Sequence, residues 1–117
     1  FPFFKLAYAL YLHHATNYAP GDDLLREANE VLKSIPKDFQ ESPAYWWTLG
    51  LVNERMQNWD LVFLAGKKLV KLDHDEMRGH YLLFRFYAAD TDEKDQKRSE
   101  EHRLKWAELR KVKLEGH

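Results

Sequence analysis

Six histidines are the residues of this chain best suited to metal binding or acid–base chemistry, and their spacing decides whether they can act together. His13 and His14 are adjacent, so their side chains diverge on a helix. The segment "DHDE" places His74 among carboxylates, and His80 follows, but no two histidines have the four-residue spacing that puts two ligands on one helix face. We therefore expect solvated histidines and no metal site.

Catalytic motifs are missing from the sequence. It has no cysteine, which excludes disulfides, thiolate zinc sites and cysteine nucleophiles and leaves the redox compartment open. It contains no phosphate-binding glycine loop and no G-x-S-x-G elbow, and no nucleophile has a recognisable base. We expect a protein that is not an enzyme and binds no cofactor.

The last 27 residues combine basic and apolar side chains around Trp106. The basic residues are Lys97, Arg98, Arg103, Lys105, Arg110, Lys111 and Lys113. Acidic residues interleave them and the net charge of the chain is −1, so we expect no nucleic-acid binding. An apolar strip is the better candidate for contacts, either on the preceding helix or with another chain; it comprises Leu104, Trp106, Ala107, Leu109, Val112 and Leu114.

Helical periodicity runs through the whole chain, and no alternating pattern predicts a strand. With 117 residues and 44% hydrophobic content, residues 1–117 are expected to form one all-α domain. The expected helices cover residues 3–16, 23–34, 43–56, 59–72 and 77–89, with a long charged helix at the end. The expected N-cap residues are Asp22, Ser42, which is followed by Pro43 at the first helical position, and Thr91. Because the chain starts at Phe1, we expect it to be excised from a longer protein.

The first expected helix is apolar almost all round, which predicts burial on more than one side. Lys5 interrupts the apolar run, no cleavage pattern of small residues follows, and the run is too short to span a bilayer. We expect no membrane insertion. The compartment is left open, with the cytoplasm favoured.

A repeat of about 34 residues is visible in the sequence, and its clearest copy begins at Pro43 and carries residues 44–50, "AYWWTLG", in its first helix. Counted from Pro43, the fourth, seventh, eighth, seventeenth and thirtieth positions are Trp46, Leu49, Gly50, Trp59 and Leu72. This pattern resembles the tetratricopeptide repeat (TPR), whose first helix carries W-x-x-L-G. The resemblance implies repeats at about 5–38, 43–76 and 77–110, that is, antiparallel helix pairs stacked as a short superhelix with a charged C-terminal capping helix.

The middle repeat departs from the family pattern at several positions. Val62 and Leu69 stand where small residues are expected, Gly66 replaces an aromatic residue, and His74 replaces proline. Bulkier residues at a close helix contact change the crossing angle, so the curvature of the superhelix is left open.

The TPR resemblance separates the two adjacent tryptophans. It implies that Trp46, with Leu49 and Gly50, packs inside the helix pair, whereas Trp47 faces a concave groove. The groove positions implied for the middle and last repeats are Trp47, Leu51, Glu54, Arg55, Arg78, Tyr81 and Arg85, together with Ala44; a weaker alignment adds Ala9, His13 and Thr16. The family's clamp for chaperone C-terminal carboxylates would use Ala9, His13, Thr48, Arg78 and Leu82, of which only Arg78 suits it.

The expected function is therefore that of a protein–protein interaction module, a scaffold, adaptor or chaperone-like domain that binds a peptide or partner helix. Aromatic and arginine side chains supply most interface energy, so the groove suits a peptide with apolar anchors and an acidic group. Two alternatives stay open for the site: Trp47 packs on the preceding repeat, and the arginines pair with nearby carboxylates. The alternative functions are self-assembly into a homo-oligomer and a regulatory or substrate-positioning role in a larger enzyme.

Overall fold

The computed structural model describes residues 2–17, 22–90 and 92–115, and these residues form helices and short connections without any strand. The helices are α1 (Pro2–Ala15), α2 (Asp22–Lys33), α3 (Pro43–Arg55), α4 (Trp59–Leu72), α5 (Met77–Ala88) and α6 (Glu93–Glu115), with a 3-10 turn η1 (Lys37–Phe39) before α3. The expected all-α fold is confirmed. The expected helix starts and ends agree to within a residue or two.

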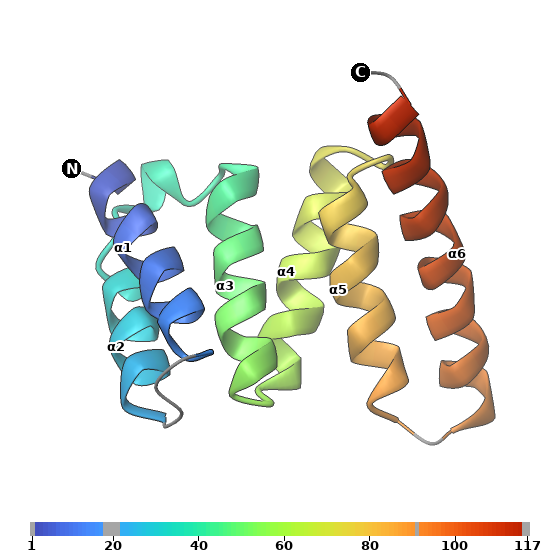
Figure 1. The fold of residues 1–117 in the computed structure, drawn as a ribbon, viewed down its shortest axis with the longest axis horizontal. Helices are drawn as coiled ribbons and strands as arrows, with labels where there is room; N and C mark the ends of the chain where they lie inside the picture. The colour runs from blue at the N-terminus through green and yellow to red at the C-terminus, as the bar shows by residue number, and fades with distance from the viewer. Residues whose placement is uncertain (1, 18–21, 91, 116–117) are drawn as a thin grey trace.

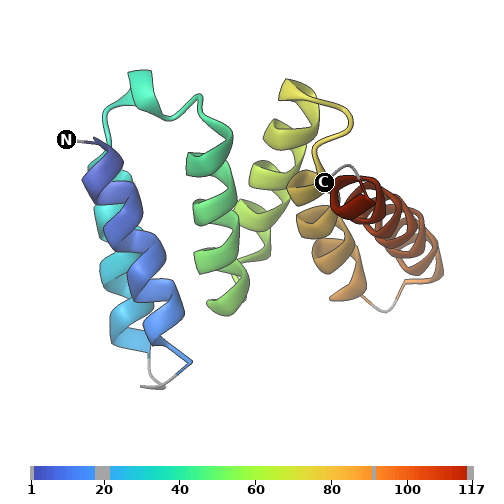
Figure 2. The same ribbon diagram turned by 45° about the horizontal axis from the view of Figure 1, so that its top comes forward.

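The helices form three antiparallel pairs that stand side by side, α1 with α2, α3 with α4, and α5 with α6 (Figure 1). The first helix of each later pair contacts both helices of the pair before it: α3 contacts α1 and α2, and α5 contacts α3 and α4. In Figure 2, α6 is foreshortened and runs obliquely, whereas α1 and α2 run from top to bottom of the picture, so α6 is tilted relative to the first pair. The expected stack of helix pairs is confirmed.

Local sequence explains where α3 and α5 begin and where α3 ends. The Ser42 hydroxyl accepts a hydrogen bond from the Tyr45 backbone N–H at 3.2 Å, and Pro43 occupies the first helical position, as expected. Gln57 adopts a left-handed φ of 59°, which turns the chain from α3 into α4. The Glu76 carboxylate caps α5 by accepting from the Arg78 N–H at 3.2 Å. Helix α2 begins at Asp22, one residue before its expected start, and Thr91 lies outside the described residues.

The apolar core runs through all three pairs, and Trp46 belongs to it, as expected. Its largest fully buried side chains are Leu32, Leu69, Leu82, Val52, Val62 and Asn53. Asn29 of α2 is also buried, although it is polar. The Asn53 Nδ2 donates to Asn29 Oδ1 at 3.2 Å, so the two buried amides satisfy each other between α2 and α3.

Glycines mark the points where helices of neighbouring pairs approach most closely. A Cβ added to Gly50 of α3 would lie 2.3 Å from Leu82 Cδ1 of α5. A Cβ on Gly66 of α4 would lie 2.9 Å from Leu83 Cγ. The helices thus approach closely although Val62 and Leu69 are bulky, because the small residues stand at other positions of the stack.

Helix α1 is buried on one side only. Phe3 and Phe4 are 74% and 75% exposed and Tyr11 is 64% exposed, whereas Ala9 and Leu12 are buried. Among the described residues, α1 packs mainly on α2 and α3, with Phe3 also touching Phe39 of η1, and no α-helix packs closely on its opposite face. The expected burial on more than one side was wrong. Among the described residues, no helix is long and apolar enough to cross a membrane.

Candidate functional site

A hollow of about 410 Å³ lies where α3, α5 and α6 meet, and we call it the aromatic groove. Its lining residues are Trp47, Leu51, Met77, Arg78, Tyr81, Trp106 and Arg110. Four of the seven residues expected from the sequence therefore come together here: Trp47, Leu51, Arg78 and Tyr81. Each helix contributes a large aromatic side chain.

The three aromatic side chains of the groove form a continuous row. The Tyr81 ring lies 5.7 Å from the Trp47 ring in an edge-to-face arrangement and 5.7 Å from the Trp106 ring. The Arg110 guanidinium stands over the Trp106 ring at 5.7 Å. This row is a half-exposed surface with an apolar face and a cation beside it.

The two arginines of the groove differ in their partners. Arg78 binds Glu76 through Nε–Oε1 at 2.7 Å and Nη2–Oε2 at 3.2 Å, and this hydrogen-bonded guanidinium lowers the pKa of Glu76. Within the described residues, Arg110 has no ion pair with a carboxylate. Arg110 is therefore the cation that a bound acidic group can reach without displacing an existing partner.

The remaining three expected site residues do not line the groove. Arg85 binds Glu54 with Nε–Oε1 at 2.6 Å, which links α5 to α3. Arg55 donates to Thr16 Oγ1 at 2.9 Å and to Asn17 Oδ1 at 2.6 Å, so it ties α3 to the end of α1. These side chains hold helices together at the edge of the groove.

The structure bears on both alternatives for the groove residues. Arg78 and Arg85 do pair with carboxylates, as one alternative holds. Trp47 packs on Tyr81 of the following pair, whereas the other alternative placed it on the preceding pair. The positions offered by the first repeat are closed, because Ala9, His13 and Thr16 are buried.

Trp106 and Arg110 are the groove residues that sequence reasoning missed. In the sequence they stand out only as members of a basic helix with an apolar strip, and the repeat pattern assigns no groove positions to that helix. The strip itself is divided: Trp106 and Leu109 are half-buried, whereas Val112 and Leu114 are 61% and 67% exposed. Helix α6 has 23 residues and α5 has 12, so at about 1.5 Å per residue α6 is longer by roughly 16 Å, and its C-terminal end extends past α5 (Figure 1).

The histidines are not uniformly solvated, and that expectation was wrong. His13 and His80 are buried, with 7% and 4% of their surface exposed. His80 Nδ1 lies 2.9 Å from His102 Nδ1, and His80 Nε2 lies 2.8 Å from the carbonyl oxygen of His74. In the part of the chain that the structure describes, no three metal-binding side chains gather into a group.

His13 makes stability depend on pH. Burial first, then the charges of Arg55 and His14, lower the pKa of His13 to about 4. Since an unfolded histidine has a pKa near 6.5, the unfolded chain binds more protons between the two values, and stability present above about pH 6.5 is lost as the pH falls toward 4. We expect the loss of stability between pH 7 and pH 4.5, measured by urea unfolding, to be about 2 kcal/mol smaller in His13→Gln than in the unmodified chain. Equal acid losses in the two proteins would contradict this assignment.

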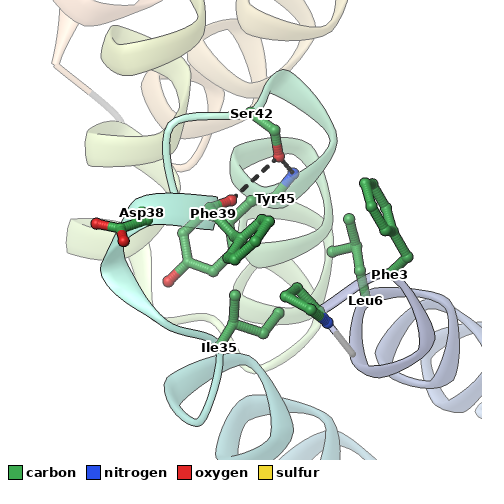
Figure 3. Close-up of a pocket in the computed structure, with 8 residues that line it drawn as sticks. Phe3, Leu6, Ile35, Asp38, Phe39, Ser42 and Tyr45 are labelled. Atoms are coloured by element: carbon green, nitrogen blue, oxygen red, sulfur yellow. Dashed lines mark hydrogen bonds between the residues drawn. The ribbon is translucent and has the colours of Figure 1, made fainter.

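A second, smaller hollow of about 140 Å³ lies between α1 and η1 (Figure 3). Phe3, Leu6, Ile35, Phe39 and Tyr45 supply its apolar walls. The Ser42 Oγ is already engaged with the Tyr45 N–H and the Phe39 carbonyl, and Asp38 points away from Phe3 and Leu6. Because this hollow is about a third the size of the aromatic groove, it is a weaker candidate than the groove.

Comparisons of the chain with protein-family models, curated proteins and solved structures gave no match.

Proposed function

We propose that this chain is a TPR-like protein interaction module that binds a peptide or a helix of a partner protein in the aromatic groove. The observation that carries the proposal is the row of Trp47, Tyr81 and Trp106, brought together from three helices. Aromatic side chains held by packing give large contact area at a small cost in conformational entropy. Such a row is typical of a binding surface.

Support for the TPR-like assignment comes from the packing of the helix pairs. The first helix of each later pair contacts both helices of the pair before it, which is the way solenoid repeats bury their apolar faces. Trp46, Leu49 and Gly50 are buried at the three positions where the repeat pattern requires core residues. The charged helix α6 covers α5 at the end of the stack, as a terminal cap does.

The groove favours a partner segment with an apolar anchor and a neighbouring acidic group. An aliphatic or aromatic anchor fits between Trp47 and Trp106 over the Tyr81 ring. A carboxylate beside the anchor reaches the exposed guanidinium of Arg110, which can donate a charge-assisted hydrogen bond to it. The module has no catalytic role of its own in this proposal.

Binding in the groove is tested with peptides selected by the protein itself. Random twelve-residue peptides displayed on phage are selected for binding to the folded chain. The selected peptides are synthesised, and their binding is titrated by fluorescence anisotropy. We expect the selected peptides to combine an apolar anchor residue with Asp or Glu. We expect Trp106→Ala and Arg110→Ala each to weaken their binding about tenfold or more, in the range of an interface hot spot.

Val112→Ala is the matched control, since Val112 is exposed on the same helix and does not line the groove. It should bind as the unmodified chain does. Peptides that bind the Trp106→Ala and Arg110→Ala chains with unchanged affinity would refute the groove as the binding site.

Self-assembly is a second candidate function, favoured by the uncovered face of α1. Phe3, Phe4 and Tyr11 expose aromatic rings there, and exposed apolar patches of this kind mark association surfaces. Light scattering separates the two functions: a mass that rises with concentration and falls back in Phe4→Ser supports self-assembly through this face.

A further inference from the structure

His80 of α5 and His102 of α6 form a contact that no expected role of the chain explains. Their Nδ1 atoms are 2.9 Å apart and their rings lie 5.2 Å apart at 32°, while Tyr87 stacks on His102 at 5.7 Å. His80 is buried and His102 half-buried. We call this contact the histidine pair.

The surrounding hydrogen bonds fix the protons of the histidine pair at neutral pH. The carbonyl oxygen of His74 can only accept, so His80 Nε2, at 2.8 Å, carries a proton and donates it. A neutral His80 then has a bare Nδ1, and His102 Nδ1–H donates to it across 2.9 Å. One proton therefore joins the two rings.

The pair can take up one proton and keep its hydrogen bond, but not two. The first added proton can bind at Nε2 of His102, which leaves the N–H···N bond in place. A second proton must bind Nδ1 of His80, which removes the acceptor and leaves two N–H donors and two positive charges facing each other. Two protons thus turn an attractive contact into a repulsive one.

We propose that the histidine pair is an acid-sensitive contact whose double protonation releases α6 from α5 and thereby takes apart the aromatic groove. The regulatory part of this inference rests on the proposed function of that groove. Trp106 and Arg110 stand four and eight residues after His102, on the same side of α6, and Tyr81 directly follows His80. Release of α6 therefore removes one wall of the groove together with its free arginine.

The charges around the histidine pair favour its neutral form. Burial, the neighbouring His80 and Lys67 of α4 lower the pKa of His102, and Glu101 of α6 opposes them.

Other charged side chains also lie near the histidine pair. Lys68 and Lys71 of α4 line a hollow with His102 and Tyr87, and Arg98 of α6 stands over Tyr87. The titratable groups on the side of the loop before α5 include His74, Asp75 and Lys105. Because the folded pKa of His102 lies below the ordinary value near 6.5, the stability that the neutral ring contributes is present above that pH and is lost as the pH falls.

Two other contacts between α6 and the rest of the chain, one an ion pair and one a neutral hydrogen bond, do not change over the same pH range. The hydrogen-bonded Lys105 ammonium, 3.3 Å from Asp75, lowers the pKa of that carboxyl, so this ion pair persists in mild acid. Ser99 Oγ donates to the Phe84 carbonyl at 3.0 Å, a contact with no titratable group. Of these three contacts, the histidine pair is thus the one that responds to mild acid.

Hydrogen exchange tests the release of α6 without any partner. Exchange of α6 amides is compared with exchange of α3 and α4 amides at pH 7 and pH 5, corrected for the intrinsic pH dependence, in a His13→Gln background that removes the other buried histidine. We expect the protection of α6 to fall at least tenfold more than that of α3 and α4 at pH 5.

His102→Asn is the informative variant, because its amide can donate to or accept from His80 Nδ1 without adding a charge. It should keep α6 protected at pH 5, whereas the exposed-residue control His14→Asn should behave as the background chain does. If the protection of α6 amides does not fall at pH 5, or if it falls as much in His102→Asn as in the background chain, the inference is refuted. Should His102→Asn fail to fold, NMR titration of the background chain decides: α6 must loosen together with the later of the two proton uptakes by the pair, and loosening at any other pH refutes the inference.

The two proposals fail in different ways. If α6 is released at pH 5 while selected peptides stay bound, the groove is not their site and the proposed function is wrong. If peptide binding at pH 7 requires Trp106 but α6 remains protected at pH 5, the groove stands and the histidine inference is wrong.

Discussion

Replacing Trp46 by alanine is expected to lower the free energy of unfolding by about 3–5 kcal/mol, the range for a buried aromatic side chain. Trp46 is 9% exposed, its ring meets Tyr45 edge-to-face at 5.1 Å, and Lys68 of α4 covers it at 5.7 Å. The substitution leaves a cavity between α3 and α4 that the surrounding helices fill only in part. Urea unfolding followed by circular dichroism at pH 7 measures the loss.

Trp47→Ala is the matched comparison, because it removes the same side chain one residue later. Trp47 is half-buried on the aromatic groove and packs on one ring, Tyr81, at 5.7 Å. We expect a smaller loss of about 1–2 kcal/mol, mostly the aromatic contact. Equal losses for the two tryptophans would show that Trp47 is as much a core residue as Trp46, and its assignment to the groove would fail.

Leu82→Ala is expected to cost about 2–5 kcal/mol, since Leu82 is fully buried where α5 meets α3. Its effect is coupled to Gly50, whose missing side chain makes room for Leu82 Cδ1. In the unmodified chain, Gly50→Ala forces a Cβ into that atom and should destabilise by about 1–2 kcal/mol net of the higher helix propensity of alanine. In the Leu82→Ala chain the same change fills the vacated space and should stabilise.

The sign reversal is measured with the four chains of a double-mutant cycle, unfolded in urea under one set of conditions. Additive effects, with Gly50→Ala equally destabilising in both chains, would mean that Gly50 and Leu82 do not share this contact. The close approach of α3 and α5 would then have to be explained by other residues.

Much of the fold follows from local chemistry that the sequence displays. Ser42 and Pro43 define the start of α3 because a hydroxyl cap and a missing N–H act within one turn of the chain. The apolar period predicts α4 from Trp59 to Leu72, and the repeat spacing places Trp46 in the core. Trp47, Leu51, Arg78 and Tyr81 come together because the same spacing puts them on one side of two neighbouring first helices.

The missed features all depend on contacts between residues far apart in sequence. His80 meets His102 only because α6 turns back along α5, and a histidine on a half-polar helix gives no sign of such a partner. The same return brings Trp106 and Arg110 to the groove. The face of α1 stays uncovered because the number of neighbours a helix has is a property of the stack, which apolar content alone does not determine.

The buried amides of Asn29 and Asn53 have a consequence for how the first two helix pairs are aligned. Apolar surfaces slide past one another at little cost, but Asn53 Nδ2 also donates to the Leu49 carbonyl at 2.8 Å, so its orientation is fixed within α3. A shift of α2 by one turn would separate the two amides and leave polar groups unsatisfied in the core, at about 1–3 kcal/mol each. One hydrogen-bonded pair of side chains thus selects a single register from several that the hydrophobic effect alone would accept.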